Sequence, residues 1–186
     1  MTRPAPAWFA AVLTGIAIPV LVLLVLWRAP SPLVLAGGPI FTLGLMGVGI
    51  IGAATTGRFW VGVLLALLST ACLIVLAFAL GMPALPHPLS TGLAMVIASG
   101  SFAARGALFA TTLSHRGWLM ALFVVVGEAS VLLIVSTFPG VLPYWFLALL
   151  PAQWASIAIQ TAPVSYTHLR AHETNDLIAY AVFSWK

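Results

Sequence analysis

Six apolar stretches, each of about 18 to 25 residues, occupy most of this sequence and are separated by short links. They cover residues 7–27, 33–55, 59–80, 89–113, 117–138 and 142–161. At a rise of about 1.5 Å per residue, a helix over each stretch is long enough to cross the roughly 30 Å hydrocarbon core of a bilayer. The pattern predicts an all-α, polytopic transmembrane helical bundle of about six spans.

The amino-acid composition also indicates that lipid, rather than water, surrounds most of the chain. Of the 186 residues, 62% are hydrophobic and 5% are charged, and the mean hydropathy is +1.17. Soluble domains carry about 25% charged residues, because their surfaces must face water. The lipid bilayer is therefore the expected partner. No nucleic acid is expected, because the seven basic residues are scattered singly rather than clustered into a patch.

The basic residues also predict the orientation in the membrane. Short links make neighbouring spans antiparallel, so Arg3, Arg58 and Arg116 fall on one side, whereas Arg28 falls on the other. Positive residues accumulate on the cytoplasmic side of membrane proteins. We therefore expect a multi-pass protein of the cytoplasmic membrane with a cytoplasmic N-terminus.

Prolines and glycines predict local features of the spans. Kinks are expected at Pro19, Pro39 and Pro151, because proline removes a backbone donor and presses on the carbonyl four residues earlier. The second stretch contains six glycines, which favour close helix packing over a substrate path. The first and last three stretches show no convincing repeat, so the sequence does not support an inverted-repeat transporter.

The C-terminal segment VSYTHLRAHET raises the question of a metal site, because a helix would bring His168, His172 and Glu173 together. The zinc-protease helix has another order, with the glutamate directly after the first histidine. The segment instead resembles the translation of a transposase-end sequencing adapter. That resemblance covers residues 163–186 and implies an artefact tail, a native chain truncated near residue 162, and no metal site or cofactor.

Within residues 1–162 the chemistry reduces to very few groups. Glu128 is the only acidic residue there, so no carboxylate pair is available for acid–base catalysis. No motif of a hydrolase, nucleotide-binding or dinucleotide-binding enzyme is present. No catalytic residue is therefore assigned, and an enzyme is not the favoured interpretation.

Two charges lie inside apolar stretches. Arg105 in SFAARGALFA is about 12 Å deep from the end of its span, and Glu128 in VVVGEASVLL is about 16 Å deep from the same side. The short SHRG link makes the two spans neighbours, so we expect an intramembrane ion pair. The pair either joins two helices or takes part in anion binding or proton transfer, and the sequence leaves both open.

Weaker polar markers accompany this pair. Helical spacing places Ser101 and Thr112 on the face of Arg105, which predicts a mildly polar interior stripe. In the sixth stretch, Gln153 and Gln160 mark an interior face that interhelical hydrogen bonds would explain.

The favoured function is a permease-like or accessory membrane component with the Arg105–Glu128 pair at its polar centre. One alternative is a membrane-embedded enzyme acting on lipid or isoprenoid phosphates, in which Arg105 and Arg116 hold the anion and Glu128 is the general base. Another alternative is a structural subunit of a membrane complex. A membrane-protein partner or a second copy of the chain is compatible with each of these.

Overall fold

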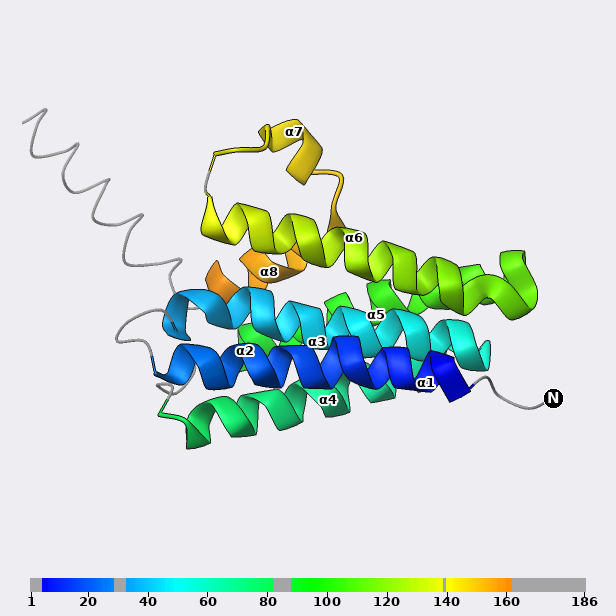
Figure 1. Ribbon diagram of the computed structural model, residues 1–186, viewed down its shortest axis with the longest axis horizontal. Helices are drawn as coiled ribbons and strands as arrows, with labels where there is room; N and C mark the ends of the chain where they lie inside the picture. Colours follow the sequence, from blue (N-terminus) through cyan, green and yellow to red (C-terminus); the bar gives the residue numbers. More distant parts are fainter. Residues whose placement is uncertain (1–4, 29–32, 82–87, 139, 162–186) are drawn as a thin grey trace, which may run out of the picture.

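The computed structural model describes residues 5–28, 33–81, 88–138 and 140–161, and these residues form helices without any strand. Figure 1 shows them as a bundle of long, roughly parallel and antiparallel helices. The helices are α1 (Ala5–Val12), α2 (Ile18–Trp27), α3 (Leu33–Thr56), α4 (Phe59–Ala79), α5 (Pro88–Leu113), α6 (Gly117–Thr137), α7 (Tyr144–Leu147) and α8 (Pro151–Thr161). A π-helical turn (Leu13–Ala17) joins α1 to α2, and a 3-10 helix (Ser114–Arg116) joins α5 to α6.

Four helical segments are long and apolar enough to cross a membrane. These are Ala5–Trp27, Gly37–Thr56, Phe59–Ala79 and Pro88–Thr137. The last contains α5 and α6, which are separated by the 3-10 helix and pack against each other. The expected membrane helical bundle is confirmed, whereas the expected number of six spans is not.

The sixth expected span, residues 142–161, is not a single helix. It is divided into the four-residue α7 and the 11-residue α8, with a non-helical link between them. The stretch therefore does not form one continuous helix in the described part of the chain. The uniform apolarity of this stretch concealed the break, because periodicity alone does not distinguish one buried helix from two short ones.

Helix α3 lies at the centre of the bundle. It packs against α1, α2, α4, α5, α6 and α8. Within its segment Gly37–Thr56, 89% of the most apolar stretch is buried in the bundle. A helix that is apolar on all sides is buried in this way. Its glycines permit the close contacts: a Cβ added at Gly47 would lie 2.7 Å from the backbone nitrogen of Gly15. The predicted tight packing of this glycine-rich stretch is therefore present in the described part of α3.

The first helix changes its hydrogen bonding at a proline. Pro19 has no N–H to donate to the carbonyl of Gly15, four residues earlier. The hydroxyl of Ser69 on α4 donates to that carbonyl at 2.9 Å instead. The π-helical turn lies over the same residues, as π-turns commonly do where the regular ladder is interrupted. The helix therefore continues through the proline with a bond from a neighbouring helix. Pro39 likewise lies inside a helix, α3.

The two ends of the bundle differ in charge. Arg58 and the 3-10 helix with His115 and Arg116 lie at the end where α1 begins, on the right in Figure 1. Arg28 caps α2 at the opposite end. The described basic residues of the loops are thus distributed between the two ends as the antiparallel order of the helices requires.

Candidate functional site

The two charges inside the apolar helices contact each other. The Nη2 of Arg105 on α5 donates a hydrogen bond to Oε1 of Glu128 on α6, and the two groups also form an ion pair. The side chain of Glu128 is 6% exposed and that of Arg105 is 28% exposed. The α5–α6 hairpin explains the contact, because the 3-10 helix reverses the chain and puts the two residues at similar depth. The structure thus brings together the two residues that sequence reasoning selected first.

Glu128 also binds the start of α8. The backbone N–H of Ala152 donates to its Oε2 at 3.3 Å. The first N–H groups of a helix have no partner within the helix, and they carry the positive end of its dipole. Pro151, the first residue of α8, lacks an N–H, so Ala152 is the first residue of this helix that needs an acceptor. The carboxylate therefore joins α5, α6 and α8 through one oxygen to Arg105 and one to Ala152.

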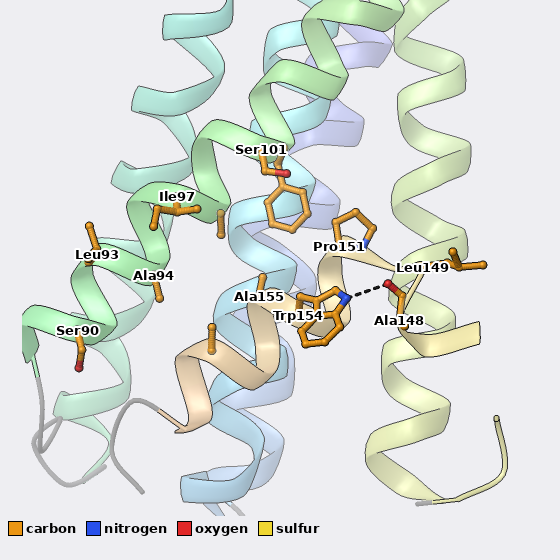
Figure 2. Close-up of a pocket in the computed structure, with 13 residues that line it drawn as sticks. Ser90, Leu93, Ala94, Ile97, Ser101, Ala148, Leu149, Pro151, Trp154 and Ala155 are labelled. Carbon is orange, nitrogen blue, oxygen red and sulfur yellow. Dashed lines mark hydrogen bonds between the residues drawn. The ribbon is translucent and has the colours of Figure 1, made fainter. Parts of the chain in front are cut away.

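The link before α8 has its own hydrogen bonds. The amides of Leu149 and Leu150 donate to the carbonyls of Phe146 and Leu147, at 3.2 and 3.1 Å. The indole Nε1 of Trp154 donates to the carbonyl of Ala148 at 2.8 Å (Figure 2). Non-helical backbone at membrane depth is tolerated where neighbouring groups satisfy it. These bonds explain how the chain can turn there and begin a new helix.

A groove of about 630 Å³ lies between α5 and the start of α8 (Figure 2). Its walls are mainly apolar and come from the first half of α5 and from residues 148–158. They include Leu93, Ala94, Ile97, Ala98, Phe102, Leu149, Pro151, Trp154 and Ala155. Ser90 and Ser101 also line the groove, about 16 Å apart along α5. The volume falls in the range of about 300 to 1,000 Å³ that is typical of ligand pockets.

The groove ends beside the polar cluster. Ser101 lies one helical turn before Arg105 and on the same face of α5, because residues four apart are neighbours on a helix. Pro151 lines the same end of the groove and directly precedes Ala152, which binds Glu128. The other guanidinium nitrogen of Arg105, Nη1, is buried and has no hydrogen-bond partner in the described part of the chain. The cluster therefore consists of a balanced ion pair with one donor nitrogen still unsatisfied.

The remaining predicted polar residues do not form one interior stripe. Ser101 is exposed to the groove, as described above. Thr112 is exposed and donates to the carbonyl of Leu108 in its own helix at 2.9 Å, so its expected interior position is wrong. Gln153 is half-buried beside a smaller hollow of about 270 Å³. Gln160 lies in α8, and its side chain is outside the described residues.

Other expectations concern residues near the chain end and the loops. The segment with His168, His172 and Glu173 lies outside the described residues. Among the described residues, no three histidine, cysteine or acidic side chains are grouped as metal ligands would be. Pro151, expected to kink a span, begins α8 instead. Sequence reasoning did not predict that a helix begins there, although proline is common at the first position of a helix.

The fold and this site define a helical membrane protein with a polar cluster at mid-bundle depth. The chain matches no known protein family, no curated protein and no solved structure.

Proposed function

We propose that the protein is a permease-like or accessory membrane component whose functional centre is the cluster of Arg105, Glu128 and the start of α8. In this proposal the centre binds a ligand that reaches it through the groove between α5 and α8. The observation that carries the proposal is an ion pair that binds the first amide of α8 and lies one helical turn beyond Ser101, which lines a ligand-sized groove. Ionisable groups within membrane helices are expensive and commonly mark functional sites.

The start of α8 within the bundle supports the same proposal. Helices that begin at mid-membrane depth present free amides and a positive dipole end, which membrane transport proteins use to bind substrates and ions. Here Glu128 accepts from the first amide of α8, so the start of the helix, the carboxylate and Arg105 act as one unit. A ligand that binds Arg105 would therefore also affect the position of α8. Such coupling suits a permease or a regulatory subunit better than a purely structural one.

The geometry gives less support to the enzyme alternative. Arg105 and Arg116 are 11 residues apart, which corresponds to about 16 Å along α5 and its turn. Two side chains at that spacing do not converge on one phosphate group. Glu128 already accepts from two donors, which leaves its carboxylate poorly suited to abstract a proton.

We further propose that this centre lies in the cytoplasmic membrane, with the N-terminus and the Arg58 and Arg116 loops on the cytoplasmic side. The positive-inside rule supports this orientation. A reporter enzyme fused after Arg116 should therefore be active on the cytoplasmic side, and one fused after Gly81 on the opposite side. Reversed activities would overturn the orientation and leave the binding proposal intact.

The experiment that tests the binding function is copurification from the native membrane. The protein is extracted in polymer-bounded lipid discs, and the bound small molecules are extracted and measured by mass spectrometry. A bilayer-soluble compound at stoichiometric amount with the wild type, and absent from a variant with Ala94→Trp in the groove, would support the proposal. Ala104→Trp is the matched control, because Ala104 is exposed on the same helix and outside the groove. Equal lipid content in all three samples would refute it.

A further inference from the structure

We infer that the end of the bundle at which α1 begins carries a binding surface for anionic phospholipid head groups, formed by Arg58, Arg116 and the tryptophans that follow them. This surface lies apart from the groove and from the Arg105–Glu128 pair, so it goes beyond the proposed function. Three observations carry it: the relative position of two turns, the charge of their arginines and the depth that the tryptophans indicate.

The turn between α3 and α4 and the turn between α5 and α6 lie on neighbouring helices at similar depth. A Cβ added at Gly106 on α5 would lie 2.2 Å from the carbonyl oxygen of Ile50 on α3, so the two helices touch there. Both helices run towards the same end of the bundle (Figure 1). From this contact α3 continues for six residues to Thr56 and α5 for seven residues to Leu113. Packed helix axes are about 8 to 10 Å apart, so the two turns begin close together.

Each of these turns places an arginine directly before the next helix. In the first turn Gly57 has a φ of 68°, and Arg58 precedes α4. In the second turn Ser114 has a φ of 51°, and Arg116 precedes α6. Both arginine side chains are exposed, and so is that of His115 between Ser114 and Arg116. The short turns therefore hold two exposed arginines close to the ends of apolar helices.

Neither arginine has a counter-charge within the described part of the chain. Glu128 is the single acidic residue there, and it is 6% exposed and paired with Arg105. It lies twelve residues after Arg116, which is about 18 Å along α6. The charge of Arg58 and Arg116 is thus available to a partner from outside. Guanidinium groups bind phosphate through paired hydrogen bonds, which makes a phosphate the fitting partner.

Two tryptophans indicate that this charge lies at the membrane surface. Trp60 follows Arg58 by two residues in the first turn of α4, and its side chain is 71% exposed. Trp118 follows Arg116 by two residues in the first turn of α6. Tryptophan rings favour the head-group level of a bilayer, so the arginines beside them lie near the lipid phosphates. Anionic lipids attract basic residues at this level, and an anionic phospholipid is therefore the occupant that fits the surface.

Native mass spectrometry of the purified full chain tests this inference. The protein is equilibrated in detergent micelles that contain equal amounts of phosphatidylglycerol and phosphatidylcholine with the same acyl chains, and the lipids retained on it are counted. We expect phosphatidylglycerol to be retained roughly ten-fold more than phosphatidylcholine. High salt during equilibration should reduce this preference, because salt screens exposed charges. Excess free glycerol phosphate should not displace the lipid, because it lacks the acyl chains that bind the apolar helices.

Three variants locate the binding surface. Arg58→Gln combined with Arg116→Gln should remove most of the preference for phosphatidylglycerol, and each single substitution should lower it by about three-fold. Arg28→Gln is the matched control. Arg28 is also exposed and also adjoins a tryptophan, Trp27, but it lies at the opposite end of the bundle. This control should keep most of the preference. Circular dichroism and size-exclusion chromatography verify that each variant is folded.

Several results would overturn the inference. Equal retention of the two lipids by the wild type, or an unchanged preference in the double variant, would show that this surface binds no anionic lipid. An equal loss in Arg28→Gln would show that total charge, and not this surface, attracts the lipid. Displacement by glycerol phosphate would indicate a soluble phosphate as the ligand, and an acidic protein that copurifies with the wild type alone would replace the lipid as the partner. The groove is tested separately by the copurified small molecules.

Discussion

Exchanging the two charges of the ion pair should restore only part of the stability that each single substitution removes. The variant combines Arg105→Glu with Glu128→Arg, and the single Glu128→Ala is its reference. Removing one partner of a buried pair typically costs about 3 to 5 kcal/mol. Because Arg105 is 28% exposed, we expect the lower end of this range, about 3 kcal/mol, for Glu128→Ala.

The exchanged pair keeps its mutual attraction but loses the contact with α8. An arginine at position 128 has no acceptor for the N–H of Ala152, and its charge lies at the positive end of the α8 dipole. An orphaned buried donor costs about 1 to 3 kcal/mol, and the unfavourable dipole adds about 0.3 to 1 kcal/mol. We therefore expect the exchanged variant to lie about 2 kcal/mol below the wild type. It should remain above the single Arg105→Glu, which places two carboxylates side by side.

The assay is reversible unfolding in mixed micelles, with dodecyl sulfate as the denaturant and far-ultraviolet circular dichroism as the signal. The neutral double variant, Arg105→Leu with Glu128→Gln, serves as the control and should lie within about 1 kcal/mol of the wild type, since neutral replacements of buried pairs are often tolerated. Wild-type stability of the exchanged variant would refute the role of Glu128 at α8. A loss below about 1 kcal/mol for Glu128→Ala would refute the burial of the pair.

Three further results are expected. Ser69→Ala should destabilise the protein by about 1 to 3 kcal/mol in the same unfolding assay, because the carbonyl of Gly15 loses the hydroxyl that donates to it in place of the missing N–H of Pro19; wild-type stability would contradict that bond. Gly106→Ala should be severely destabilising, because its Cβ would lie 2.2 Å from the carbonyl oxygen of Ile50, whereas Gly127→Ala meets nothing within 4 Å and should be neutral or up to about 1 kcal/mol stabilising. Long-read sequencing of the genomic locus, from DNA never exposed to the adapter, should give codons other than those for VSYTHLRAHET after position 162, and recovery of these codons would reject the adapter interpretation.

The ion pair shows what the sequence made predictable. Arg105 and Glu128 are rare charges in apolar stretches. Their depths could be compared from the rise per residue of a helix, counted from the two span ends that the four-residue link joins. Membrane spans leave few alternative partners for such groups, which is why the expectation was specific. The class of fold was predictable for the same reason, because length and apolarity alone identify a membrane helix.

The contact between Glu128 and α8 was not predictable in this way. Its donor is a backbone amide, that of Ala152, and every residue except proline has such a group. Only the break before Pro151 makes that amide available, and the leucines around the break look like any membrane helix. The groove also depends on this break, since it forms where α8 begins beside α5. Thr112 shows the opposite error, because its helical face was assigned to the interior although the side chain is exposed.

The central position of α3 has a consequence for biogenesis. This helix leaves the ribosome second in order, yet α5, α6 and α8, which enclose it, are synthesised later. The mean hydropathy of its apolar segment is 1.6, against 2.8 for the first helical segment. The lipid bilayer therefore stabilises an isolated α3 less than it stabilises the first segment. A newly inserted α3 therefore depends on later segments for most of its contacts. Chains whose synthesis stops early would leave this glycine-rich surface open to the membrane, where quality-control proteases that detect weakly held helices could act on it.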